Sequence, residues 1–130
     1  MPTKLDPREL ALLCAELADS RKAENLVVLD MRGISTITDF FVLATGTSEP
    51  HVRAIWNEIT LKLKKGHGIA THPPEGGRVN KWVVIDYYDV VVHVMHSVIR
   101  EQYDLDGLWN DAPIVTLPVI DKRSKSLRSG

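Results

Sequence analysis

The sequence contains a single cysteine and almost no excess of charge of either sign. Cys14 has no second thiol with which to form an internal disulfide or a cysteine-based metal site, which is typical of a reducing, intracellular compartment. The 16 basic residues are balanced by 17 acidic ones, so the chain lacks the broad positive field that docking onto nucleic acid usually requires. We therefore expect no extended RNA-binding surface.

Long apolar runs are absent as well. No stretch approaches the roughly 18 apolar residues of a membrane-spanning helix, and the N-terminal residues reach Asp6, Arg8 and Glu9 without the apolar core of a signal peptide. We therefore expect a cytoplasmic protein that is neither exported nor inserted in a membrane.

The 44% apolar content is sufficient for one core. We predict a single domain over residues 1–120 and a flexible basic tail over 121–130, whose polar composition does not support packing.

Hydrophobic periodicity and β-branched residues predict an alternation of helices and strands. Helices are expected over about 7–22, between Ser48 and Gly66, and over about 97–103. Strands are expected over 26–29, 40–44, 81–86 and 89–95, with a further short strand over 69–72. The first two strands carry continuous apolar residues, which indicates burial on both faces. The predicted fold class is therefore α/β, with helices packed on a sheet.

The most informative segment is the predicted hairpin from Trp82 to Met95. A two-residue turn at Tyr87 and Tyr88 would place Asp86 opposite Asp89, Val84 opposite Val91 and Trp82 opposite His93. The residues on one face are then almost entirely hydrocarbon and suit a core. The opposite face combines an indole, a thioether and two carboxylates, and its members are Trp82, Val84, Asp86, Asp89, Val91, His93 and Met95.

Two interpretations of this mixed face stand side by side. Aromatic and methionine side chains are enriched at protein interfaces, and carboxylates that face each other across a ladder need partners, so the face is a candidate docking surface with an acidic flank. In the alternative, one of the protein's own helices covers Trp82, Val91 and Met95, while Asp86 and Asp89 are simply exposed at a turn. The exposure of Trp82 distinguishes the two interpretations.

The segment TGTS at residues 45–48 joins an apolar strand to a helix, where free amides can hold a phosphate. It lacks the lysine of a Walker loop and the three glycines of a dinucleotide-binding loop, so we favour Ser48 as a helix N-cap. A nucleotidyltransferase would combine such a turn with two carboxylates on one face of a nearby strand, which bind Mg²⁺. Asp86 and Asp89 are separated by a turn and have no third ligand beside them, which disfavours that enzyme.

The histidines and Cys14 do not form a convincing metal site or nucleophile. His93 and His96 are three positions apart, so on a strand they point to opposite faces and cannot share a zinc ion. His67 and His72 flank the short predicted strand and suit solvated loops. Cys14 lies on the apolar face of the first helix, where thiols are normally unreactive. We predict no catalytic residue, no metal and no cofactor.

Three stretches of the sequence together resemble the ribosomal silencing factor family, also called the Iojap or RsfS family. They are residues 37–42 (ITDFFV) with 45–48 (TGTS), Glu75-Gly76 followed by 82–86 (WVVID), and 89–95 (DVVVHVM) followed by Arg100, Tyr103, Leu105, Leu108 and Trp109. The resemblance extends from the first helix to about Asp111. The ordered set of stretches is more specific than any one of them.

The resemblance implies a mixed β-sheet with helices packed on it, in a topology related to nucleotidyltransferases but without their catalytic residues. It also implies binding to the large ribosomal subunit through the fourteenth large-subunit protein, which sterically blocks joining of the small subunit and represses translation. Carried onto this chain, the family's docking surface falls on Trp82, Asp86, Asp89, Val91, His93 and Met95. The partner surface is basic in the family, which would account for the clustered carboxylates.

The chain departs from the family at Tyr88, where the turn usually has glycine, and at Gly107, where the family has a helix former. A primed turn would force Tyr88 to a positive φ, which a bulky residue adopts reluctantly, so the pairing of Asp86 with Asp89 stays open. Three further hypotheses are a nucleotide-binding or nucleotidyltransferase-like enzyme, a homodimer formed through the hairpin face, and a minor contact of the basic tail with ribosomal RNA.

Overall fold

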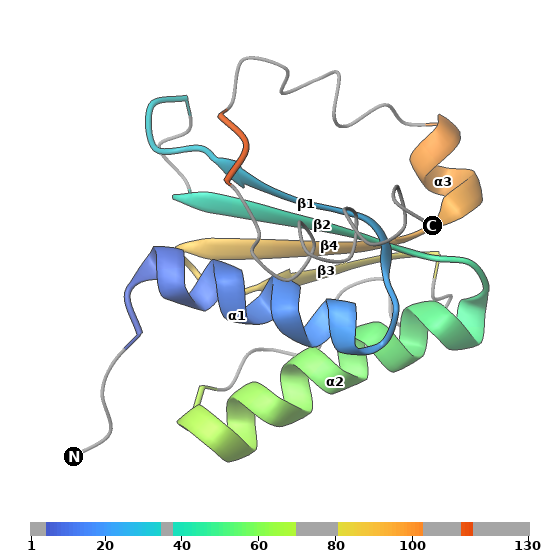
Figure 1. Ribbon diagram of the computed structural model, residues 1–130, viewed down its shortest axis with the longest axis horizontal. Coiled ribbons are helices and arrows are strands. Elements are labelled where there is room, and N and C mark those ends of the chain that lie inside the picture. Colours follow the sequence, from blue (N-terminus) through green and yellow to red (C-terminus); the bar gives the residue numbers. More distant parts are fainter. Residues whose placement is uncertain (1–4, 35–37, 70–80, 103–112, 116–130) are drawn as a thin grey trace, which may run out of the picture.

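The computed structural model (Figure 1) describes residues 5–34, 38–69, 81–102 and 113–115. In chain order its elements are α1 (Pro7–Ser20), β1 (Glu24–Asp30), β2 (Phe40–Gly46), α2 (Glu49–His67), β3 (Trp82–Asp86), β4 (Val90–His96) and α3 (Ser97–Gln102). Each corresponds to a helix or strand predicted from the sequence. Residues 70–72 of the further predicted strand, Tyr103, Gly107 and the predicted tail lie outside the described residues. Within the described ranges, no helix is both long enough and apolar enough to cross a membrane.

The four strands form one mixed sheet in the order β1-β2-β4-β3. The outer pairs are antiparallel, whereas β2 and β4 in the centre run parallel. Parallel neighbours need a long crossover connection, and α2 lies in that connection. Residues 113–115 follow the outer edge of β1, where Ile114 bridges to Leu29. This architecture confirms the predicted α/β class with a mixed sheet.

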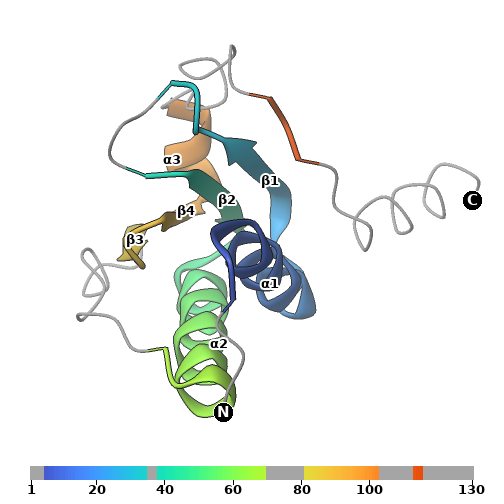
Figure 2. The same ribbon diagram turned by 90° about the vertical axis from the view of Figure 1, so that its left-hand side faces the viewer.

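Helices α1 and α2 cover one face of the sheet, as Figures 1 and 2 show. The start of α1 is fixed by a capping box, in which the Asp6 carboxylate accepts the Glu9 N–H at 2.8 Å and the Asp6 N–H donates to the Glu9 carboxylate at 3.1 Å. Both helices turn their apolar side to the strands. The buried helical residues are Leu10, Ala11, Cys14, Ala15 and Ala18 of α1, and Val52, Ile55, Ile59 and Leu63 of α2.

The two ends of α2 show one confirmed prediction and one error. Ser48 is the N-cap, since its hydroxyl accepts the His51 N–H at 3.2 Å. The prediction that Gly66 ends the helix is wrong, because α2 continues to His67 and the left-handed residue is Gly68, with φ 67°. The Gly68 N–H then donates to the Lys64 carbonyl at 3.1 Å and so satisfies one of the last free carbonyls of the helix.

The register of the hairpin differs from the predicted one by two residues. Asp86 pairs with Val91, Val84 with His93 and Trp82 with Met95, so the proposed pairing of Asp86 with Asp89 is wrong. The reason is a longer turn, which is closed by a hydrogen bond of 2.9 Å from the Tyr87 N–H to the Val90 carbonyl. Side chains of a strand alternate with a period of two, so a shift by two residues leaves the side chains of β3 and β4 on their predicted faces. Tyr88 in the turn does not follow this alternation, since it is exposed and not part of the core beside Val90.

Candidate partner-binding face

The sheet face turned away from α1 and α2 carries three rows of residues that cross the strands. The rows are Leu29, Phe41, Val91 and Asp86 nearest the hairpin turn, then Val27, Leu43, His93 and Val84, then Thr45, Met95 and Trp82 nearest α3. Some of these side chains are buried together in a second apolar cluster, against which Ile99 of α3 packs. The half-buried apolar side chains on β2, β3 and β4 we call the open face, and they are Phe41, Trp82, Val84 and Val91.

Trp82 and His93 form the polar contact of this face. The Trp82 indole N–H donates to His93 Nδ1 at 3.2 Å, and the two ring centroids lie 6.2 Å apart. Because Nδ1 accepts a hydrogen bond, the ring proton of the neutral imidazole is on Nε2. Burial lowers the pKa of His93 to about 4, so the ring is neutral at pH 7 and can accept from the indole. Trp82 is thereby held over His93 and only half-buried.

Met95 and His93 lie beneath the open face. Met95 is fully buried in the second cluster with Leu29 and Leu43, and His93 is only 9% exposed. The prediction that Met95 offers exposed contact area is therefore wrong, because the alternation of β4 places it on the expected face but cluster residues cover it. The interpretation that the protein's own elements cover this face thus holds for Met95, whereas Trp82 and Val91 stay half-buried.

The two aspartates lie at the hairpin turn, but they do not face each other. Asp86 is exposed, and its carboxylate accepts the Tyr88 N–H at 2.8 Å. The carbonyl oxygen of the half-buried Asp89 accepts the N–H groups of Asp39 and Phe40, at 2.9 and 3.1 Å. These contacts join the β3–β4 turn to the start of β2. We call Asp86, Asp89 and Asp39 the acidic flank; Asp39 comes from a second segment of the chain and interacts electrostatically with Arg32.

Phe41 is a residue of this face that the sequence pattern did not indicate. The parallel pairing of β2 with β4 places Phe41 beside Val91, and its ring meets that of His93 edge-on, with centroids 5.1 Å apart. Phe41 belongs to an apolar run without alternation, which gives no indication of the side that stays partly open. Only the strand order β1-β2-β4-β3 brings Phe41 to this face.

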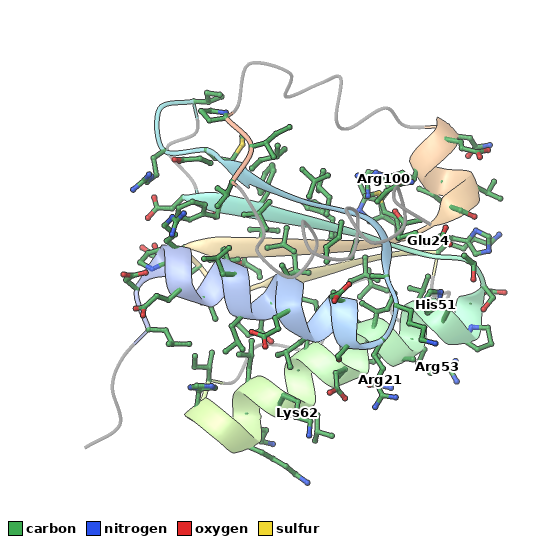
Figure 3. All side chains as sticks on the ribbon, viewed as in Figure 1. Arg21, Glu24, His51, Arg53, Lys62 and Arg100 are labelled. Atoms are coloured by element: carbon green, nitrogen blue, oxygen red, sulfur yellow. The ribbon has the colours of Figure 1, made fainter. Side chains whose placement is uncertain are left out.

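The TGTS segment at the start of α2 is occupied by internal contacts. The Thr47 N–H donates to His51 Nδ1 at 2.9 Å, while His51 Nε2 lies 2.8 Å from the carbonyl oxygen of Arg21 at the end of α1; Figure 3 shows His51 and Arg21 at neighbouring ends of the two helices. A Cβ on Gly46 would lie 2.8 Å from the Val52 backbone nitrogen. The segment therefore serves the close packing of α2 on β2, and the amides of Thr47 and His51 are already engaged.

Arg100 anchors α3 to the end of β2. Its guanidinium donates to the Thr45 hydroxyl at 2.8 Å, and this contact is partly buried. Arg100 is labelled in Figure 3. Since α3 directly follows β4, the contact fixes the helix over the third row of the sheet face. Arg100 thus has a structural role in the attachment of α3 to the sheet.

The other residue types considered from the sequence do not assemble a reactive site in the part of the chain that the structure describes. Burial raises the pKa of the Cys14 thiol to about 12, so the thiol stays protonated and unreactive at neutral pH. His93 and His96 point to opposite faces of β4. Within the described ranges, no group of three or more His, Cys, Asp or Glu side chains is placed to hold a metal ion.

The fold and this face define a class of protein, namely a small mixed-sheet α/β domain with two helices on one side and a half-open apolar face with an acidic flank on the other. Residues 4–129 match the family model described as "Ribosomal silencing factor during starvation". The chain belongs to the ribosomal silencing factor family, as its resemblance predicted.

Individual relatives agree with this assignment. The chain is 46% identical to the ribosomal silencing factor RsfS of Halalkalibacterium halodurans over 85% of this chain and 93% of the relative. It is 37% identical to the RsfS of Bacillus subtilis over 87% of this chain and 95% of the relative. A crystal structure of a protein from Chromobacterium violaceum has a TM-score of 0.77 at 32% identity and covers 82% of this chain and 88% of the other.

Proposed function

We propose that this protein silences translation by occupying the large ribosomal subunit. In this proposal it binds the fourteenth large-subunit protein through the open face and the acidic flank, and the bound domain sterically blocks joining of the small subunit. Membership of the ribosomal silencing factor family supports a ribosome-associated, regulatory role. The proposal involves no bond-breaking step, no metal and no cofactor, and it places the protein in the cytoplasm.

The observation that carries the proposal is the pair of half-buried side chains Trp82 and Val91 beside the exposed Asp86. Covering an indole and two or three aliphatic or aromatic side chains contributes about 25 cal/mol for each Å² of apolar surface removed from water. A carboxylate at the rim contributes chiefly to the association rate and to the choice of a basic partner. The arrangement therefore suits a partner that brings a basic rim and an apolar centre.

Each predicted site residue acquires a distinct role in this proposal. Trp82 is the anchor, and Val91 extends the apolar contact. Asp86 and Asp89 supply the charge at the edge. His93 and Met95 act from below, because His93 holds the indole through its Nδ1 and Met95 fills the buried cluster under it.

The test is co-sedimentation of the purified protein with isolated large subunits, together with a pull-down on the isolated fourteenth protein. Trp82→Ala is expected to weaken binding roughly 30-fold, which corresponds to about 2 kcal/mol for the loss of an aromatic anchor. Trp82→Phe keeps a ring and is expected to retain most of the affinity. Leu61→Ala removes an exposed side chain of α2, which covers the other face of the sheet, and serves as the matched control. Equal binding of Trp82→Ala and Leu61→Ala would contradict the proposed face.

Two rival hypotheses are tested with the same samples. A nucleotidyltransferase-like enzyme is expected to bind nucleoside triphosphates with Mg²⁺ in calorimetric titrations and not to co-sediment with large subunits. A homodimer formed through the hairpin face is expected to dissociate on Trp82→Ala, which light scattering measures. A monomer that binds large subunits and no nucleotide supports the proposal.

A further inference from the structure

Tyr88 is the most exposed large hydrophobic side chain in the described part of the chain, at 84% exposure. It lies in the β3–β4 turn, two residues after Asp86, which ends the first row of the open face, and directly after the buried Tyr87. At this exposure the ring gains almost nothing from packing within the protein. The fold therefore does not explain why a large aromatic residue occupies this position.

The backbone conformation at this position is also unfavourable for a tyrosine. Its φ is 76°, in the left-handed region that disfavours residues with a Cβ and especially bulky ones. The turn holds this conformation through hydrogen bonds that do not depend on the ring, from the Tyr88 N–H to Asp86 at 2.8 Å and from the Tyr87 N–H to Val90 at 2.9 Å. Glycine would satisfy the same hydrogen bonds without strain. Strain of this kind persists where surrounding structure enforces it, and it concentrates at functional sites.

The surroundings of Tyr88 indicate what the ring would contact. Asp86 contacts the Tyr88 N–H through its carboxylate, and Asp89 follows Tyr88 directly, so two carboxyl groups lie close to Tyr88 in the sequence and in the turn. The more distant Asp39 interacts electrostatically with Arg32. The face of an aromatic ring also attracts cations, most often the guanidinium of arginine. Both features favour the same partner group, a basic side chain on a protein surface.

We propose that Tyr88 is a second anchor of the docking surface, which stacks on an arginine or lysine side chain of the basic partner protein while the neighbouring carboxylates pair with its charge. This inference rests on the proposed function and adds to it a contact residue at the turn. In this inference the tyrosine lowers the stability of the folded protein through its strained backbone, and in return its ring contributes to binding of the partner.

The test measures stability and binding in the same set of variants. Tyr88→Gly is expected to raise the melting temperature by roughly 3–5 °C, because it relieves the positive φ. The same variant is expected to weaken binding to large subunits about tenfold, because the ring is lost. Tyr88→Asn tolerates the left-handed conformation without a ring, and we expect it to bind as weakly as Tyr88→Gly. Tyr88→Phe keeps the ring and is expected to bind like the unmodified protein.

Lys22→Gly is the matched control for relief of strain. Lys22 has a φ of 61° just after the end of α1, where the Lys22 N–H donates to Asp19 and the Ala23 N–H to Ala18, as in a helix cap that normally contains glycine. We expect this variant to gain stability with unchanged binding. Tyr88→Gly that binds as tightly as the unmodified protein overturns the inference alone, whereas an unmodified protein that fails to bind large subunits overturns the proposed function and this inference with it.

Discussion

His93 lies between two aromatic rings, those of Phe41 and Trp82, on a sheet face that is otherwise mostly apolar. Phe41 meets its ring edge-on and Trp82 donates a hydrogen bond to its Nδ1. The neutral form suits both contacts, whereas protonation at Nδ1 would remove the acceptor for Trp82. Burial disfavours the charged ring, and this links the stability of the fold to pH.

The pKa of His93 predicts a loss of stability in acid. Between the ordinary pKa of 6.5 and about pH 4, His93 is protonated in the unfolded chain but stays neutral in the folded chain. The unfolded state therefore gains stability as the pH falls through this window, at about 1.4 kcal/mol per pH unit. Urea denaturation of the unmodified protein and of His93→Asn, measured from pH 7 to pH 4, isolates this contribution. The variant keeps an acceptor for Trp82 and should show a shallower loss, and parallel curves would contradict the assignment.

At the scale of elements, α2 shows how glycine positions are determined by tertiary contacts. Gly46 precedes the helix at a point where Val52 approaches the backbone, while a Cβ on Gly66 within the helix would meet nothing within 4 Å. Both glycines look like helix boundaries in the sequence. Only the structure shows that Gly46 is required for close packing, that Gly66 is an ordinary helical position and that Gly68 provides the cap.

Alanine at these two glycines is expected to have opposite effects. Gly46→Ala forces the Cβ against the backbone of Val52 and should lower the free energy of unfolding by about 1–3 kcal/mol, as overpacking does. Gly66→Ala removes a flexible residue from a helix interior and should raise it by up to about 1 kcal/mol. Urea denaturation at pH 7 measures both. A destabilising Gly66→Ala would indicate that the helix ends earlier than Gly68.

The hairpin shows why the faces of strands can be predicted better than their pairing. Alternation of side chains assigned Trp82 and Val91 to one face, and an error of two residues in register left that assignment intact. The positive φ that a primed turn would require at Tyr88 is present, but the length of the turn was not predictable, because it depends on the contact of the Asp86 carboxylate with the Tyr88 N–H and on closure between Tyr87 and Val90. The alternation of side chains thus determines the face on which a strand residue lies, whereas the length of the turn determines the residue with which it pairs on the neighbouring strand.

For the whole molecule, periodicity and capping residues predicted the seven elements and the α/β class. They did not predict the strand order, which depends on long-range pairing of β2 with β4 and which brings Phe41 to the open face. Nor did they predict that Met95 is buried while Trp82 stays half-buried, because this depends on the cluster against which Ile99 of α3 packs. In the part of the chain that the structure describes, one sheet face is therefore covered by α1 and α2 and the other is partly open, and the proposed activity belongs to the open one.

In the proposed function, occupation of the open face keeps the ribosomal subunits apart, and a subunit-joining experiment measures this effect. Isolated large and small subunits are mixed with increasing amounts of the protein, and the joined fraction is measured on sucrose gradients or by light scattering. We predict that the unmodified protein and Leu61→Ala reduce joining once the large subunits are saturated, and that Trp82→Ala does so only at roughly 30-fold higher concentration. Full joining in the presence of saturating, bound protein would contradict the account.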